Sequence, residues 1–164
     1  MMSPSLRKLM LTVHVASSVG WIGAITAYVA LNVPAIASED EPTVRASYLM
    51  MDVVARYALV PLGGVALVTG IIQALGTSWG MFRHYWVLAS LSLTSVAFAV
   101  LVLHLGPVER NAAVAADPHG NVTQLGGDLV HSVGGLLVLL VVLILNIYKP
   151  RGLTRHGWRR QRGR

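Results

Sequence analysis

Four long apolar runs alternate with short polar segments along the chain. The runs cover Leu9–Val33, Val53–Leu75, Tyr85–Gly106 and Leu129–Ile147. A bilayer core of about 30 Å needs roughly 20 apolar helical residues, and a membrane strand would instead alternate apolar and polar positions. The pattern therefore predicts an all-α fold, a four-helix transmembrane bundle with up-down-up-down connections.

Prolines and glycines along the chain refine the expected helix boundaries and bends. Proline favours the first helical turn, so we expect the second helix to begin near Pro42, outside the bilayer. Pro61, followed by Gly63 and Gly64, should kink this helix or let a neighbour approach closely. The third run ends at Gly106, and a long outer loop is expected over residues 107–127.

Small residues mark the expected contact faces, because apolar burial alone does not drive helices together in lipid. Each predicted helix has such a face. The residues are Ala16, Gly20 and Ala24, then Ala66 and Gly70, then Ala97 and Ala99, then Gly134 and Gly135. They fit a compact bundle, and some of these faces could instead mediate a homodimer.

Charge supports a membrane protein and predicts its orientation. Only 12% of the 164 residues are charged, against about a quarter in soluble domains. One side of the predicted bundle carries ten basic and no acidic residues, and the other carries three basic and all seven acidic residues. The positive-inside rule then places both termini in the cytoplasm, with residues 1–148 as the membrane domain and 149–164 as a basic cytoplasmic tail. The basic residues thus indicate a membrane orientation rather than nucleic-acid binding.

Several classes of chemistry are excluded. The chain has no cysteine, which removes disulfides, thiolate metal sites and iron-sulfur clusters. It also lacks a nucleophile elbow, a His-Glu-x-x-His motif and a phosphate-binding glycine loop.

The first apolar run is too long for the core of a cleaved signal peptide, so we expect it to remain as a span.

Histidines near the outer ends of the last two spans are the first candidate site. His104 and His131 lie at matching depth on sequential antiparallel helices. Two imidazoles on facing helices can ligate one heme iron, and Arg56 at similar depth could pair with a propionate. Asp128, three residues before His131, could orient the histidine ring. The alternative is that both histidines are solvated at the membrane interface.

A second pair, His14 and His84, lies toward the inner side. His14 shares one helical stripe with Ser18, Trp21, Ile25 and Tyr28. This stripe fits either a heme or metal ligand or a hydrogen-bonded packing contact. His84 lies in an aromatic and basic cluster typical of a membrane interface. If both pairs held heme, electrons could cross the bilayer.

Metal handling is the alternative to heme. Met50 and Met51 with His104, His131 and Asp128 could form a mixed nitrogen and sulfur site for copper. A third interpretation is a non-catalytic accessory subunit of a larger membrane complex, in which the histidines only pack or face the interface.

His14, Trp21 and Gly23 on the first run, with the stretch from Gly76 to Trp86, carry a resemblance. The chain resembles an uncharacterised family of four-span bacterial membrane proteins, actinobacterial in type. It is more distantly similar to copper-resistance D-type proteins and to the small flavin-free protoporphyrinogen oxidase. That oxidase binds heme b through a first-helix histidine, a role that the resemblance would give to His14. The chain lacks the strongly basic, aromatic continuation that such oxidases have after this helix.

Together these patterns predict a multi-pass protein of the bacterial inner membrane. The leading expectation is heme b binding with a redox role, and copper is the alternative cofactor. Expected partners are the lipid bilayer and a redox partner or larger membrane complex.

Overall fold

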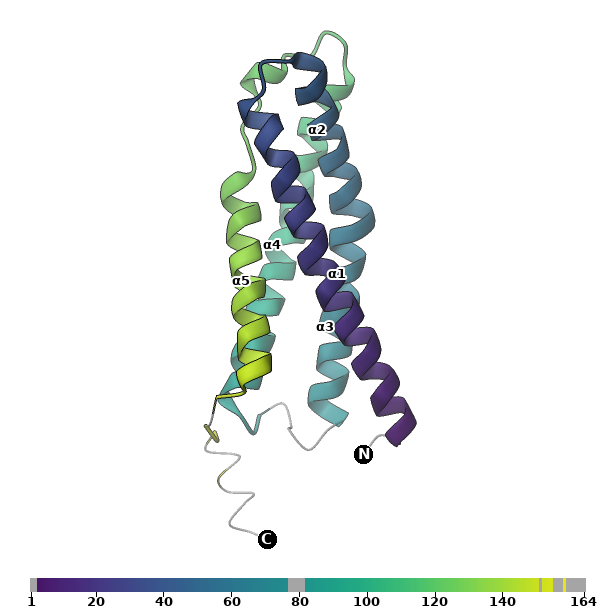
Figure 1. Cartoon of the computed structure of the whole chain (residues 1–164), viewed down its shortest axis with the longest axis vertical. Helices are drawn as coiled ribbons and strands as arrows, with labels where there is room; N and C mark the ends of the chain where they lie inside the picture. Colours follow the sequence, from purple (N-terminus) through teal and green to yellow (C-terminus); the bar gives the residue numbers. More distant parts are fainter. Residues whose placement is uncertain (1–2, 77–81, 151, 155–157, 159–164) are drawn as a thin grey trace.

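The computed structural model describes residues 3–76, 82–150, 152–154 and 158, which form helices and no strand. Four helical segments are long and apolar enough to cross a membrane: Pro4–Ala37, Glu41–Gly76, Tyr85–Ala116 and Leu129–Tyr148. They pack side by side along one axis (Figure 1). The predicted all-α four-helix bundle is confirmed, and the chain is a multi-pass membrane protein.

The first span is a single helix, α1 (Pro4–Ala37). The side chain of Ser3 caps it by accepting a hydrogen bond from the Leu6 N–H at 3.4 Å, which satisfies one of the amides that a helix start leaves free. Helix α1 packs against all the other spans except α4, with which it has little direct contact.

The second span is continuous but changes its geometry midway. It runs through α2 (Glu41–Val54), a π-helical turn η1 (Ala55–Leu59) and α3 (Val60–Gly76). Asp40 caps its start by accepting from the Thr43 N–H at 3.1 Å, so the helix begins where Pro42 predicted. Pro61 has no N–H, and its ring crowds the carbonyl one turn earlier, so the wider π turn just before it relieves that clash.

The third span, α4 (Tyr85–Ala116), corrects the expected boundary at Gly106. The helix continues through Pro107 for another nine residues, so the expected loop over 107–127 is much shorter. One proline removes a single backbone hydrogen bond. The following segment is rich in alanine, a strong helix former, and it buries Val108, Ala112 and Ala115.

Arg45 stabilises the C-terminal end of this extended helix. Its guanidinium donates to the carbonyls of Ala115 at 3.1 Å, Asp117 at 2.7 Å and Gly120 at 2.6 Å. The last carbonyls of a helix have no partner within the helix. A single cation on α2 therefore caps the C-terminus of α4 and links the two helices at this end of the bundle.

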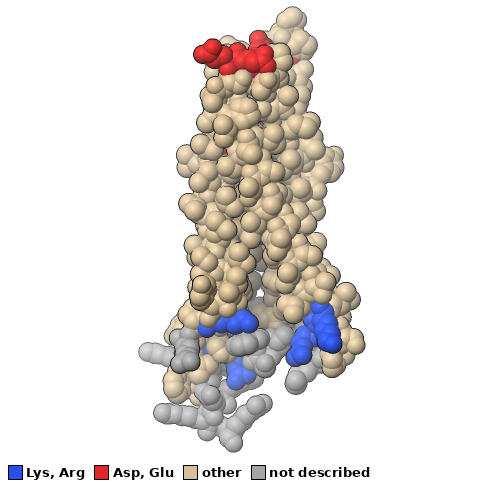
Figure 2. All heavy atoms as spheres, in the orientation of Figure 1, with Lys and Arg blue, Asp and Glu red and all other residues tan. Residues whose placement is uncertain are grey.

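The last span is α5 (Leu129–Tyr148), which ends at Lys149 in the left-handed conformation with φ of 44°. A short 3₁₀ turn, η2 (Val122–Gln124), precedes it. The start of α1 and the end of α5 lie at the same end of the bundle (Figure 1). Figure 2 shows acidic side chains at the opposite end and basic side chains beside the termini. The cytoplasmic placement of the termini stays a prediction.

Several glycines let the helices approach closely, but Gly134, which was expected on a contact face, has no atom within 4 Å of a built Cβ. A Cβ on Gly63 would lie 2.8 Å from the Trp21 ring, so α1 and α3 meet through this ring. Gly20 faces Leu62, and Gly135 faces Ile25. Most of the buried residues, including Trp21, Tyr28, Tyr48, Met51 and Leu59, form one core in the half of the bundle away from the termini. This half is called the outer half below, and the half beside the termini is called the inner half, as names of position only.

Two expectations fall largely outside the described residues. Residues 77–81 of the stretch that carried the resemblance lie there, and so does most of the basic tail over 149–164. The described part of the tail contacts the start of α4, where Tyr85 N–H donates to Gly152 O at 3.3 Å.

Candidate metal centre

Three polar side chains meet where α4 and α5 come together in the outer half of the bundle. His104 lies on α4, and Asp128 is the residue that precedes the first turn of α5. His131 follows three residues later, and three-residue spacing puts two side chains on the same face of a helix. The start of α5 therefore presents Asp128 and His131 together toward His104.

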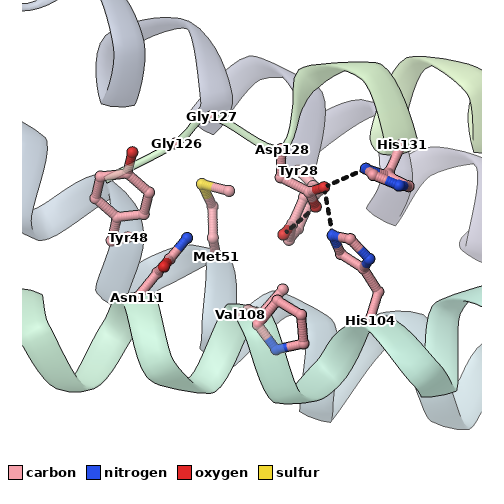
Figure 3. A pocket seen from close by; sticks show the side chains of 11 residues that line it. Tyr28, Tyr48, Met51, His104, Val108, Asn111, Gly126, Gly127, Asp128 and His131 are labelled. Carbon is pink, nitrogen blue, oxygen red and sulfur yellow. Dashed lines mark hydrogen bonds and ion pairs between the residues drawn. The ribbon is translucent and has the colours of Figure 1, made fainter. Parts of the chain in front are cut away.

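The distances bring all three into contact. His104 Nε2 lies 2.8 Å from Asp128 Oδ1, and His131 Nδ1 lies 3.3 Å from the same oxygen. The two imidazole rings have their centres 4.1 Å apart with 34° between their planes. One ligand atom from each residue lies within 4.8 Å of the others. Figure 3 shows the two rings converging on the carboxylate.

Asp128 Oδ1 is the atom that suggests a cation. It is buried, and among the described residues no group makes an aligned hydrogen bond to it, although two ring nitrogens lie nearby. A buried carboxylate oxygen without a directed partner is costly. A protonated imidazole would compensate this oxygen as an ion pair, and so would a metal ion among the three ligand atoms. Two imidazoles with one carboxylate are a donor set that fits a metal.

Two residues of α1 hold Asp128 in place. The Tyr28 hydroxyl donates to Asp128 Oδ2 at 2.8 Å, and Asn32 Oδ1 accepts from the Asp128 N–H at 3.0 Å. Asn32 is completely buried, and its amide nitrogen donates to Tyr28 O at 3.2 Å. Groups that fix the orientation of a ligand contribute to metal affinity. Helix α1 thus orients the carboxylate while α4 and α5 supply the histidines.

The cluster forms part of the wall of a cavity of about 210 Å³. Tyr28, Tyr48, Met51 and Asn111 line this cavity together with the two histidines and Asp128 (Figure 3). The side chain of Asp128 is only 11% exposed, that of His104 is 26% exposed and that of His131 is 56% exposed. A small molecule could therefore reach the histidines, while the carboxylate stays shielded.

The two methionines of the predicted copper site separate. Met51 is 2% exposed and lines the cavity, whereas Met50 is 48% exposed and faces outward. Successive helical residues point about 100° apart, so the pair could not share one site without distorting the helix. Met51 is the methionine available near the histidines.

Arg56 lies away from the cavity and is engaged elsewhere. Its guanidinium pairs with Asp52 at 2.8 Å and with Glu109 at 3.0 Å. Arg45 caps α4, as described above. The role of Arg56 toward a heme propionate stays a prediction.

A heme needs its porphyrin plane between the two iron-ligating rings. At 4.1 Å between centres, and with a shared carboxylate oxygen, the rings of His104 and His131 are already in contact. A bis-histidine heme would require these rings to move apart and to release Asp128. Heme binding by this pair stays a prediction, and the observed arrangement fits a single ion better.

The histidines of the inner half, His14 and His84, do not converge on a shared carboxylate. His14 Nδ1 lies 3.0 Å from Ala66 O and 3.1 Å from Thr69 Oγ1 on α3. A carbonyl oxygen only accepts, so Nδ1 carries the proton, and the contact joins α1 to α3. His84 precedes α4, and its ring lies 6.3 Å from that of Trp86. An inner ligand role for His14 and His84 stays a prediction.

Sequence reasoning missed two residues of this site, Tyr28 and Asn32. Tyr28 was recognised only as part of the polar stripe of the first span, and Asn32 continues that stripe one turn further. An uncharged amide within an apolar run, here one residue before its end, was a usable signal, because buried polar groups in membranes require partners. The partner, at the start of α5, could not be read from the spacing.

Comparisons with known protein families, with curated proteins and with solved structures found no match for this chain.

Proposed function

We propose that this membrane protein binds one divalent transition-metal ion through His104, Asp128 and His131, near the acidic end of the bundle. The observation that carries the proposal is the convergence of three ligand atoms within 4.8 Å on a buried carboxylate oxygen without an aligned hydrogen bond. As part of the same proposal, we place the protein in a bacterial inner membrane with this end outside, because basic residues favour the cytoplasmic side.

The donor set indicates which ions suit the site. Two imidazoles and one carboxylate bind Zn²⁺ well, and the same set with open positions is typical of non-heme Fe²⁺. Three protein ligands leave at least one coordination position for water or a substrate, as in catalytic rather than structural metal sites. The cavity beside the histidines provides space at that position.

A second candidate function, copper handling, is favoured by Met51. Its buried thioether lines the same cavity as His104 and His131, and thioether ligands select Cu⁺ over harder ions. If copper is the cargo, Met51→Leu will weaken Cu⁺ binding at least tenfold while Zn²⁺ binding stays unchanged. Equal losses for both ions, or no loss for either, would reject the copper candidate.

Isothermal titration tests the proposal directly. The protein in phospholipid nanodiscs is first stripped with a chelator and then titrated with Zn²⁺ or, without oxygen, with Fe²⁺. We expect one ion per chain, and a loss of affinity of about 100-fold or more in His104→Ala and His131→Ala, because losses of about 10–100-fold already follow removal of groups that only support ligands.

His119→Ala is the matched control, since His119 is an exposed histidine at the same end of the bundle that does not line the site. It should bind the ion as the wild type does. Wild-type protein that binds no ion, or that binds it equally well without His104 and His131, would contradict the proposal.

A further inference from the structure

A second, larger cavity extends from the metal-binding cluster into the membrane-spanning part of the bundle. It has a volume of about 350 Å³ and shares Tyr28, His104, Asp128 and His131 with the smaller cavity. From there it follows α4 to Leu93, eleven residues from His104, and thus extends for roughly 16 Å at 1.5 Å per residue. We refer to this space as the lateral groove.

The lateral groove is almost wholly apolar beyond its polar end. Its inner wall comes from α1 and the π turn, and its sides come from α4 and α5. The wall residues include Trp21, Ile25, Ala55 and Leu59. Such a shape, with an apolar length and a few polar groups at one end, is typical of a site for a small apolar ligand with a polar headgroup.

The groove opens toward lipid. Val96, Val100 and Val130 line it and are 62%, 44% and 84% exposed. These side chains lie on membrane-spanning helices, where the surroundings are acyl chains rather than water. A ligand that is dissolved in the bilayer can therefore enter sideways between α4 and α5.

Glycine keeps part of this opening free. Gly134 lines the groove, and a Cβ built on it would have no atom within 4 Å. The next residue, Gly135, already lies against Ile25. The open space beside α5 is therefore at Gly134, one turn from His131.

Charge decides which headgroup fits. Among the described residues that line the groove, Asp128 is the only acidic residue, and none is a lysine or arginine. Phosphate headgroups are typically held by the forked guanidinium of arginine or by lysine, and the described lining of the groove supplies neither, which disfavours phospholipids. A neutral ring with oxygen substituents fits better, because an imidazole N–H that does not face Asp128 can donate to a carbonyl oxygen, and a phenolic hydroxyl can donate to Asp128.

We propose that the lateral groove binds an isoprenoid quinone or its quinol. The ring lies beside His104, Asp128 and His131, and the isoprenoid tail lies along α4 and α5 toward Leu93. This inference deepens the proposed function, since the ring oxygen would reach the open coordination position of the metal. The tail contacts depend on the groove and not on the metal.

Tryptophan fluorescence provides the readout, because Trp21 lines the groove and quinones quench indole emission. The full chain in phospholipid nanodiscs is titrated with menaquinone-4. We expect saturable quenching, and Trp21→Phe should remove most of the quenched signal. Phospholipid is in large excess in the nanodisc, so saturation requires recognition of more than an acyl chain.

Gly134→Leu fills the groove, and Gly23→Leu is its control. Gly23 also has no atom within 4 Å of a built Cβ, but it does not line the groove. We expect Gly134→Leu to weaken menaquinone-4 binding at least tenfold while leaving Zn²⁺ affinity unchanged, and Gly23→Leu to change neither. This pairing separates the groove from the metal site.

Two results would overturn the inference. One is equal quenching affinity in Gly134→Leu and wild type. The other is full displacement of menaquinone-4 by an equal concentration of phytol, an isoprenoid alcohol without a ring, which would show that the headgroup is not recognised. Quinone binding that persists after chelation would support the groove even if the metal proposal failed.

Discussion

The outer and inner halves of the bundle each contain histidines, and they use them differently. In the outer half, His104 and His131 converge on Asp128, which Tyr28 and Asn32 hold from α1. In the inner half, His14 donates its ring N–H to a backbone carbonyl of α3. The two halves differ in what surrounds the histidines. The outer pair has a carboxylate within reach, which completes a set of three ligand atoms, whereas His14 Nδ1 is engaged by a carbonyl of α3, a contact that joins two helices.

Asp128→Asn gives the largest expected effect on this contrast. The change keeps the side-chain shape but removes the charge that both outer histidines approach. We expect Zn²⁺ affinity to fall about 100-fold or more, because a direct ligand contributes at least as much as its supporting groups. Titration calorimetry measures it, and Glu39→Gln, an exposed acid at the same end, is the control. Similar affinity in both variants would remove Asp128 from the site.

Arg45→Ala tests whether capping of α4 by this side chain stabilises the outer half of the bundle. This side chain is 18% exposed and donates to several carbonyls at the end of α4. Removing a charged hydrogen-bond donor costs about 2 kcal/mol, which should lower the melting temperature in detergent. Arg45→Lys should restore only part of this, since an ammonium lacks the planar fork. A melting temperature equal to that of the exposed control Arg110→Ala would contradict the capping role.

Tyr28→Phe tests how much one hydrogen bond to Asp128 contributes to metal affinity. It removes the hydroxyl that donates to Asp128 Oδ2 and keeps the ring in the core. We expect about a tenfold loss in Zn²⁺ affinity, typical of a group that orients a metal ligand. Tyr57→Phe provides the control, because Tyr57 is 78% exposed on the surface of η1. An unchanged affinity in Tyr28→Phe would mean that Asp128 needs no support from α1.

His14→Phe should have the smallest effect, and only on stability. The loss of the contacts with Ala66 and Thr69 is expected to cost about 1 kcal/mol, within the range measured for hydrogen bonds between membrane helices. Zn²⁺ affinity should be that of the wild type. A loss of metal binding in this variant would show that the inner histidine contributes a ligand, and the contrast between the two halves would fail.

Local pattern predicted the spans and the start of the second helix well, because length, apolarity and proline position are properties of single segments. It misplaced the end of the third span. Pro107 indicated a break, but one missing hydrogen bond is outweighed by an alanine-rich continuation that packs on α2 and is capped by Arg45. That compensation comes from another helix, so the segment alone could not show it.

The residues of the site on α4 and α5 were predictable from the sequence, whereas those on α1 were not. Matching depth on antiparallel neighbours brought His104 and His131 together, and three-residue spacing placed Asp128 beside them. The contribution of α1 was not predictable, since Asn32 and Asp128 are 96 residues apart and meet only in the folded bundle. The same holds for Met51, whose inward direction distinguishes it from Met50 only once α2 is placed.

X-ray absorption at the metal edge of Zn²⁺-loaded protein in nanodiscs identifies the ligands of the bound ion. We expect two imidazole nitrogens and at least one carboxylate oxygen at about 2.0 Å from the ion. One imidazole should disappear in His131→Ala, and the spectrum should be unchanged in His119→Ala. A first shell of water oxygens alone, or one that is the same in all three proteins, would contradict a metal centre built from His104, Asp128 and His131.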